Sequence, residues 1–300
     1  MAVIGQILGW TLAVLLGLII ASFVIDAVLR ISWENKPRFT FVEGDLSSKQ
    51  LLVVLPGAFS EAEFQLQPAV ANLRYRGHIL YVEQSGKRYS SLNTAILTAI
   101  YVADLVREGG VDKIHLLGTS QGAAVAVMAA QQMRHGSLVA DHIRLKLIAV
   151  DGVGRPDDLR QPNWVFGLMG WLPFGPIWDR LGFLNLVIQP ASEEPATEWA
   201  EHAKIGLAMV RSIPTAFWGD QMRELGSIQV TAEELASFDC VTYVSSSQDE
   251  AILKPEESLT YWRGLVPQEK FRWQVIPAGH TAYEMKPRDY ALAIDQALNS

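Results

Sequence analysis

The sequence predicts an α/β protein in which a mostly parallel sheet is flanked by helices. From residue 51 to residue 150, short apolar runs rich in Leu, Val and Ile alternate with amphipathic helical patterns. The same alternation returns from residue 241 onward, and several of the runs end at Gly, Pro or Asp. Continuous apolar runs of this length are typical of strands buried on both faces, and strands separated by helices favour a parallel sheet.

The chain begins with an uncharged apolar stretch from Ala2 to Ile25. A helix of that length measures about 36 Å, which exceeds the ~30 Å hydrocarbon core of a bilayer. A cleaved signal peptide usually carries Lys or Arg ahead of a shorter apolar core. Here no basic residue precedes the stretch, and the apolar stretch is longer than such a core. We therefore expect residues 1–30 to form a single-pass transmembrane anchor. A signal peptide and a buried core helix are the alternatives.

The charges that flank this stretch predict its orientation. Arg30, Lys36 and Arg38 follow the stretch and no basic residue precedes it. By the positive-inside rule, the rest of the chain then lies in the cytoplasm. The single cysteine, Cys240, excludes an intrachain disulfide and fits a reducing compartment without requiring one.

Composition bounds the partners of the protein. The net charge is −7 and no basic block occurs, which argues against binding to nucleic acid. Charged residues make up only 19% of the chain, a low share that is consistent with membrane contact. We find no His, Asp or Glu cluster with metal-ligand spacing and no glycine-rich nucleotide-binding loop. We therefore expect neither a metal nor a cofactor.

The predicted elements after the anchor begin with an edge strand at 38–43 (RFTFVE). The run LLVVL at 51–55 is a buried-strand candidate that ends at Pro56-Gly57. A helical pattern at 67–76 stops at Gly77, a residue type that commonly follows a helix end. The run HILYV at 78–82 is the next strand.

The next predicted elements lie before and after Ser120 in the sequence. A helix is predicted over 90–108, followed by Gly109-Gly110, and IHLL at 114–117 is a strand. A second helix covers 121–135, and LKLIAV at 145–150 is a strand that ends at Asp151. The later strands and helices are predicted at 241–245, 254–265, 272–276 and 288–298.

The alternation is interrupted between about 154 and 237, where no strand pattern occurs. This segment holds five of the nine tryptophans and the patch WVFGLMGWLPFGPIW at 164–178. The patch is too short, and too interrupted by Gly and Pro, to span a bilayer. We expect an inserted helical cap. Its aromatic residues either form the core of the cap, or line an apolar substrate tunnel or touch the bilayer surface.

The sequence from Gly118 to Gly122 fits the pattern G-x-S-x-G, with Ser120 at its centre. In a nucleophile elbow the serine occupies a strained strand-to-helix turn, and the two flanking glycines avoid crowding each other. The pentapeptide alone is a weak signal. Here it follows the predicted strand 114–117 and precedes the predicted helix 121–135, which is the setting that the chemistry requires.

With these motifs in place, residues 38–300 resemble the α/β-hydrolase fold superfamily. The resemblance implies a nucleophile, an acid and a histidine, in that order along the chain. His280, in IPAGHT directly after the strand 272–276, matches the histidine position. Asp249, in VTYVSSSQDEA, matches the acid, while Glu250 and Asp151 remain alternatives for that role. The other five histidines (His78, His115, His135, His142 and His202) are expected to be packed or solvated.

The resemblance also implies an oxyanion hole made of two backbone N–H groups. One belongs to Gln121, the residue after the nucleophile. The other lies in the loop after the strand 51–55, where Ala58 is the main candidate and Phe59 the alternative. In the family this loop often begins with His-Gly, whereas Pro56 replaces the histidine here.

These observations predict a membrane-anchored serine hydrolase, with a domain at 37–300, that cleaves an apolar, lipid-like carboxylic ester. Ser120 attacks the acyl carbon, His280 acts as general base and Asp249 orients the histidine. A serine at the elbow argues against dehalogenase and epoxide hydrolase chemistry, which require a carboxylate there. An acyltransferase or thioesterase with the same triad is one alternative, and a catalytically silent protein that binds a lipid or a partner is another.

Overall fold

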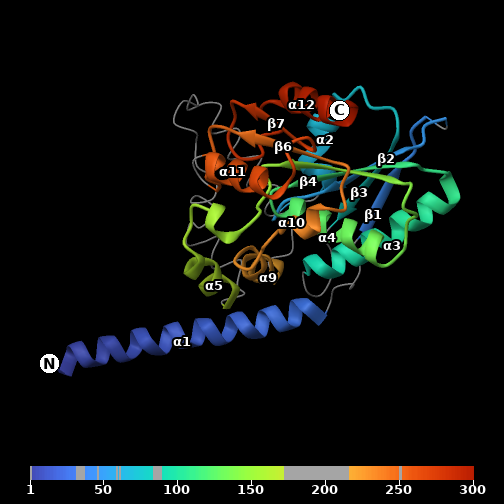
Figure 1. The fold of residues 1–300 in the computed structure, drawn as a ribbon. Helices are drawn as coiled ribbons and strands as arrows, with labels where there is room; N and C mark the ends of the chain where they lie inside the picture. The colour runs from blue at the N-terminus through green and yellow to red at the C-terminus, as the bar shows by residue number, and fades with distance from the viewer. Residues whose placement is uncertain are drawn as a thin grey trace.

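The computed structural model describes residues 2–31, 38–45, 47–58, 60, 62–83, 90–171, 216–249 and 252–300. These residues form a seven-stranded sheet with the order β1-β3-β2-β4-β5-β6-β7 (Figure 1). All neighbouring strands are parallel except β1, which pairs with β3 in the antiparallel sense. The predicted fold class is therefore confirmed.

The strands lie where the apolar runs predict them, within two residues at each end. Their bounds are β1 Arg38–Val42, β2 Gln50–Leu55, β3 His78–Glu83, β4 Lys113–Thr119, β5 Arg144–Val150, β6 Cys240–Ser246 and β7 Phe271–Ile276. The central strands β2, β4 and β5 are almost wholly buried, because helices cover both faces of the sheet. The edge strand β1 is largely exposed, in keeping with its mixed sequence.

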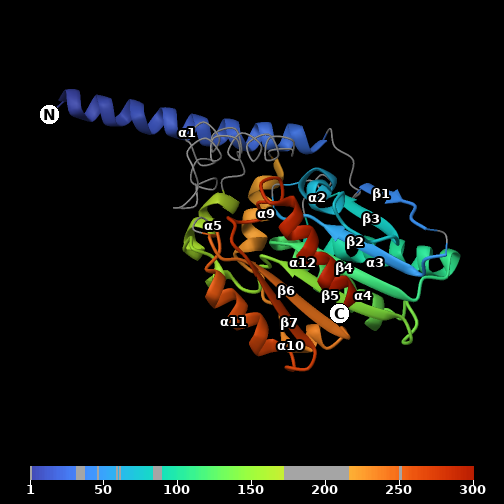
Figure 2. The same ribbon diagram turned by 90° about the horizontal axis from the view of Figure 1, so that it is seen from above.

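Helices pack against both faces of the sheet and create two hydrophobic cores. The helices that cover the sheet are α2 Ala62–Val70, α3 Ser91–Gly109, α4 Gln121–His135, α11 Pro255–Leu265 and α12 Pro287–Asn299, while no described side chain of the N-terminal helix α1 (Ala2–Ile31) belongs to either core. Ala99, Val127 and Trp262 place α3, α4 and α11 in the first core. Leu66 and Ile294 place α2 and α12 in the second. The two figures show α2 and α12 on one side of the sheet, with α3 and α4 on the other (Figures 1 and 2).

The helix expected at 67–76 is displaced in the structure. The helix α2 begins at Ala62, because the side chain of Glu83 accepts hydrogen bonds from the backbone N–H groups of Ala62 and Glu63, at 3.1 and 3.0 Å. Beyond Val70 the chain leaves the helix, and the N–H of Arg74 donates to Asp295 on α12. Both causes are tertiary contacts, so the local pattern placed the helix too late.

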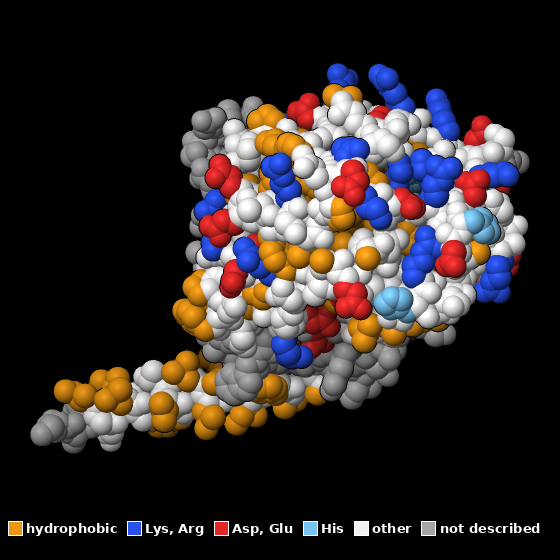
Figure 3. Space-filling model, in the orientation of Figure 1, with side chains coloured by type: hydrophobic (Ala, Val, Ile, Leu, Met, Phe, Trp, Pro, Cys, Tyr) orange, Lys and Arg blue, Asp and Glu red, His pale blue; other side chains and the backbone are white. Residues whose placement is uncertain are grey.

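The helix α1 is the candidate membrane span. Its apolar segment, Ile4–Ile25, has 22 residues with a mean hydropathy of 2.5, and none of its most apolar part is buried. Figure 3 shows apolar side chains along α1, which passes beneath α5 (Asn163–Trp171) and α9 (Ala216–Leu225) in Figure 1. This exposure excludes a buried core helix, since the helix of a soluble core would be covered. An anchor and a signal sequence both fit it.

The described residues between β5 and β6 contain helices and no strand. They form η1 (Pro156–Asp158), α5, α9 and α10 (Ala232–Leu235). Trp164, on α5, is 69% exposed, so this tryptophan is not part of a cap core. The rest of the predicted cap, including Trp178 and Trp199, lies outside the described residues, and the boundaries 154 and 237 stay a prediction.

Candidate active site

Ser120 occupies the turn between β4 and α4, at the carboxyl end of a central strand. Its backbone has φ 50° and ψ −118°, a conformation that costs free energy for any residue with a side chain. The turn is held by hydrogen bonds from the N–H of Ser120 to Val150 O (2.9 Å) and from the N–H of Ala123 to Ser120 O (3.2 Å). The serine is 7% exposed. The sequence therefore places a strained, nearly buried hydroxyl at the strand-to-helix turn.

The two glycines of the motif are required by close backbone contacts. A Cβ atom on Gly118 would lie 2.5 Å from the Cα of Ala123. A Cβ on Gly122 would lie 2.3 Å from the carbonyl oxygen of Pro56, in the loop after β2. Both distances are far below van der Waals contact, and the opposing atoms belong to the backbone. Gly122 thus lets α4 approach the loop that carries the predicted oxyanion donor.

We expect Gly122→Ala to lower the free energy of unfolding by about 1–3 kcal/mol, since the added methyl group must displace backbone. Urea denaturation of the purified chain measures this loss. Gly264→Ala is the matched control: it is also a helical glycine, but a methyl group there would meet no other atom within 4 Å, so alanine should be neutral or stabilising. Equal stability of the two variants would contradict the close approach at Gly122.

Asp249 and His280 meet at the same edge of the sheet. Asp249 follows β6 and His280 follows β7, and these strands are neighbours. The Nδ1 atom of His280 lies 2.5 Å from Oδ2 of Asp249, which is 1% exposed. The N–H groups of Ile252 and Leu253 also donate to this carboxylate, at 2.9 and 3.1 Å. The aspartate is therefore held on one side by its own turn and presents an oxygen to the imidazole.

The loop after β2 lies against Ser120. A Cβ on Gly57 would come within 3.2 Å of the Cβ of Ser120, so the residue before Ala58 lies against the serine. Gln121 is the first residue of α4, where an N–H has no partner within the helix. Phe59, the alternative donor, and Glu250, an alternative acid, lie outside the described residues.

Sequence reasoning missed Gln65, which holds this loop. Its Oε1 accepts hydrogen bonds from the N–H of Gly57 (3.0 Å) and from the hydroxyl of Ser60 (2.8 Å). Its Nε2 lies 3.5 Å from Oγ1 of Thr281, the residue after His280. Gln65 thus links the candidate oxyanion loop to the histidine loop. A glutamine on a short helix carries no sequence signal for such a role.

Asp151, the other alternative acid, contacts the loops rather than the imidazole. Its carboxylate accepts hydrogen bonds from the N–H and the hydroxyl of Ser246, both at 2.6 Å, and from the N–H of Thr281 at 2.9 Å. Burial raises the pKa of Asp151 above its ordinary value, although these hydrogen bonds and His280 oppose that shift. Asp151 therefore connects the ends of β5 and β6 to the histidine loop.

The pKa of His280 is raised above its ordinary value. Burial alone would lower it, but the negative charge of Asp249, the hydrogen bond to Asp249 and the charge of Asp151 together outweigh burial. Only the neutral imidazole can accept a proton from a serine hydroxyl. A raised pKa therefore moves the loss of general-base activity to a higher pH than an ordinary histidine would give.

For ester hydrolysis by this site, we expect kcat/KM to fall about tenfold per pH unit on the acid side, with an inflection above the ordinary histidine value of about 6.5. The measurement uses a neutral ester, with the product followed by chromatography so that the detection does not itself depend on pH. An inflection well below pH 6.5 would show that burial, not Asp249, controls this imidazole.

The remaining described histidines lie away from Ser120. His115 is fully buried in β4, and burial lowers its pKa to about 3, so it is a neutral packed residue. His78 accepts a hydrogen bond from the N–H of Gly44 at 3.1 Å. His135 and His142 are exposed. These positions fit the packed and solvated interpretations, while His202 lies outside the described residues.

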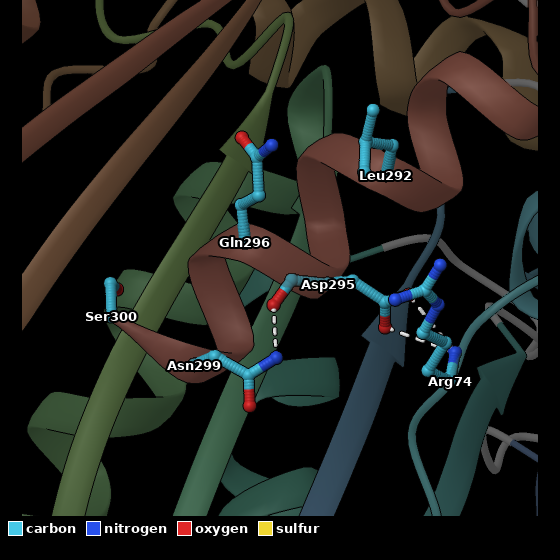
Figure 4. Close-up of a pocket in the computed structure, with 6 residues that line it drawn as sticks. All are labelled: Arg74, Leu292, Asp295, Gln296, Asn299 and Ser300. Carbon is cyan, nitrogen blue, oxygen red and sulfur yellow. Dashed lines mark hydrogen bonds between the residues drawn. The ribbon is translucent and has the colours of Figure 1, made fainter.

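A groove of about 340 Å³ lies along α12 and is separate from the site (Figure 4). Arg74, Asp295 and Asn299 line it, and Asp295 accepts hydrogen bonds from the other two. Lys113, at the amino end of β4, donates to Leu298 O on the same helix. Because Ser120 follows the carboxyl end of β4, the groove is near the opposite edge of the sheet.

Comparisons with known proteins agree with this architecture. A sequence model described as "Alpha/beta hydrolase family" matches residues 52–293. Similar solved structures include an enol-lactonase from Burkholderia xenovorans LB400 (13% identity, TM-score 0.63, 88% of this chain and 96% of that chain). An esterase from Exiguobacterium antarcticum has 13% identity and a TM-score of 0.60, with the same coverage.

MenH from S. aureus has 17% identity and a TM-score of 0.61, and covers 87% of this chain and 97% of its own. At these identities the structures establish a shared fold. No curated protein sequence gives a significant match. The family model spans Ser120, the loop after β2 and the Asp249–His280 pair, and it covers most of the chain. The protein is therefore a member of the alpha/beta hydrolase family.

Proposed function

We propose that the chain is a membrane-anchored serine hydrolase that cleaves apolar carboxylic esters through Ser120, His280 and Asp249. The observation that carries this proposal is the 2.5 Å contact between His280 Nδ1 and Asp249 Oδ2. It arises at the sheet edge where the strained turn presents Ser120. A buried carboxylate that accepts the Nδ1 proton leaves Nε2 free to act as a base, which is what a serine nucleophile requires.

The proposed reaction proceeds in two halves. The neutral His280 accepts the hydroxyl proton of Ser120 as its oxygen attacks the ester carbonyl carbon. The oxyanion that forms accepts hydrogen bonds from the N–H groups of Ala58 and Gln121. The imidazolium then donates its proton to the leaving alcohol, and the acyl group stays on Ser120. Water attacks the acyl-enzyme with His280 again as base, releases the acid and restores the serine.

Asp249 contributes by orientation and charge. It accepts the Nδ1–H of His280, which selects the tautomer that has a lone pair on Nε2, and it stabilises the imidazolium of the intermediate. The hydrogen bonds from Ile252 and Leu253 fix the carboxylate before substrate binds. Such preorganisation avoids a reorganisation cost in the transition state.

The preference for apolar esters rests on the parts of the chain next to the domain. The helix α1 exposes apolar side chains along its length, and α5 contains no charged residue and exposes Trp164. We propose that α1 anchors the chain in a membrane with the hydrolase domain in the cytoplasm. Esters with long acyl chains concentrate in such a bilayer, close to the enzyme.

Protease accessibility tests the orientation of the domain. In sealed inverted vesicles, whose cytoplasmic face points outward, added protease should digest the hydrolase domain at once. In sealed vesicles of the opposite orientation, the domain should be protected until detergent opens them. Digestion of the domain in the second preparation and protection in the first would contradict a cytoplasmic domain.

A fluorophosphonate probe tests the hydrolase proposal directly. The probe reacts with a serine whose hydroxyl is activated by a base, and we expect one covalent adduct on Ser120 of the full chain in detergent. Mass spectrometry of the digested protein locates the adduct. Heat-denatured protein is the control and should not react. Absence of an adduct on the folded chain would argue for a silent binding protein. To separate hydrolysis from acyl transfer, the reaction is run with added alcohols and the products are analysed for the free acid and for new esters.

A further inference from the structure

Two chain segments far apart in the sequence pair beside the candidate acid. Residues 158–160 lead from β5 toward α5, and residues 252–254 follow Asp249. Leu159 and Leu253 form an antiparallel bridge. The N–H of Arg160 donates to Ile252 O and the N–H of Lys254 donates to Asp158 O, both at 2.9 Å. A segment near the start of the predicted cap is thus bound to the residues that follow Asp249.

The side chain of Arg160 completes this contact. Its Nη2 donates to the backbone carbonyl oxygen of Asp249 at 2.7 Å, and its Nε lies 3.2 Å from the same oxygen. The Nε also donates to Leu253 O at 2.8 Å. The guanidinium therefore bridges the backbone of Asp249 and that of Leu253. Leu253 and its neighbour Ile252 also supply the N–H groups that hold the Asp249 carboxylate.

A hydrogen bond also joins the beginning of the predicted cap, at Gly154, to the residues that follow α9. The N–H of Val230, which follows α9, donates to Gly154 O at 2.8 Å, and the hydroxyl of Tyr261 donates to Val230 O at 2.7 Å. Arg155 lies over the Tyr261 ring, 4.4 Å from its centroid, and pairs with the buried Asp158 at 2.9 Å. The two stems of the cap are thereby joined to each other and to α11.

We propose that Arg160 is a positioning residue: it fixes the backbone of Asp249 relative to Leu253 and so couples the orientation of the Asp249 carboxylate to residues 158–160 of the predicted cap. The inference rests on the proposed function, because it concerns the acid of the proposed triad. Arginine suits the task because its planar fork reaches two carbonyl oxygens at once. A lysine offers a single point charge and can satisfy one of them well.

Loss of the Arg160 side chain has a specific consequence for His280. Without Arg160, the backbone of Asp249 and that of Leu253 are no longer bridged, and the Asp249 carboxylate is held less firmly. The His280 imidazole then interacts more weakly with the charge and the hydrogen bond of Asp249, which raise its pKa. Burial then dominates, and the pKa of His280 moves downward. A residue that merely stabilised the fold would leave this titration unchanged in the fraction of molecules that is folded.

The test compares Arg160→Ala and Arg160→Lys with Arg107→Ala in the full chain. Arg107 is an exposed arginine on α3 that pairs with Asp104, and it is the matched control. NMR titration of the His280 ring, assigned with His280→Gln, is the first readout. We expect a lower pKa in Arg160→Ala, a smaller decrease in Arg160→Lys and none in Arg107→Ala.

Ester turnover is the second readout. We expect kcat of Arg160→Ala to fall about 10- to 100-fold with KM nearly unchanged, a loss typical of a misplaced catalytic group. Millimolar ethylguanidinium should restore part of kcat in Arg160→Ala and none in Arg107→Ala. Circular dichroism tests whether each variant is folded. If Arg160→Ala does not fold, Arg160→Lys is the variant on which both readouts are made.

The proposal is overturned if a folded Arg160 variant titrates His280 as the wild type does. Wild-type kcat in such a variant would overturn it equally. Failure of the proposed function looks different: the wild-type chain would then give no Ser120 adduct and no turnover. The NMR titration of His280 would still decide whether Arg160 controls Asp249, since it needs no substrate.

Discussion

Replacement of Ser120 by alanine should lower kcat for ester hydrolysis by about 10⁶-fold, the size of loss seen when a serine-protease nucleophile is removed. The alanine variant keeps the proposed general base and oxyanion donors but has no hydroxyl to form the proposed acyl-enzyme. Release of product from a soluble ester, measured on the purified full chain in detergent, gives kcat. Covalent labelling by a fluorophosphonate should disappear in parallel.

Ser137 supplies a closely matched control for this variant. It is also a serine with φ 50°, but it lies exposed after α4, near the opposite edge of the sheet. Ser137→Ala should keep wild-type turnover and labelling, which separates loss of the nucleophile from the effect of alanine at a positive φ. Wild-type turnover in Ser120→Ala would mean that another residue performs the chemistry.

The elements around Ser120 could be predicted from sequence because each has a local cause. Apolar runs fix the buried strands, and Gly118 and Gly122 mark a turn where backbone contacts leave no room for a side chain. The helix predicted at 67–76 was wrong because its start depends on Glu83, a residue on the following strand. A contact of that kind has no signature in the residues of the helix itself.

The choice of acid shows a second limit of the sequence. Asp151 and Asp249 both follow a strand, so the sequence alone kept both as candidates. Strand order separates them geometrically: β6 and β7 are neighbours, and the hydrogen bond joins the residues that follow them. Arg160 and Gln65 escaped notice because they bind backbone groups. Nearly every residue offers the same backbone groups, so the sequence does not indicate which of them a side chain such as Arg160 or Gln65 will bind. The structure is needed to identify these contacts.

Asp249→Asn should lower kcat by about 10⁴-fold. It should also cost some stability, because the N–H of Leu253 donates to the oxygen that the NH₂ group replaces. An asparagine can still accept from the N–H of Ile252 through its oxygen, but its NH₂ group then faces His280 Nδ1 and the N–H of Leu253. The imidazole must accept that hydrogen bond, so its proton moves to Nε2, where it blocks transfer from Ser120. The remaining activity should lose its acid limb at a lower pH than in the wild type, because the charge that raises the pKa of His280 is gone.

Asp151→Asn is the decisive comparison, because it removes the other buried carboxylate near His280. Its oxygens accept three hydrogen bonds from Ser246 and Thr281, and an NH₂ group would leave some of these buried donors unpaired. We expect a loss of about 1–3 kcal/mol in the free energy of unfolding, with kcat reduced far less than in Asp249→Asn. The reverse result, with Asp249→Asn active and Asp151→Asn inactive, would transfer the role of the acid to Asp151. The two variants should differ in how far they lower kcat, since the carboxylate of Asp249 contacts the imidazole and that of Asp151 contacts the loop that carries it.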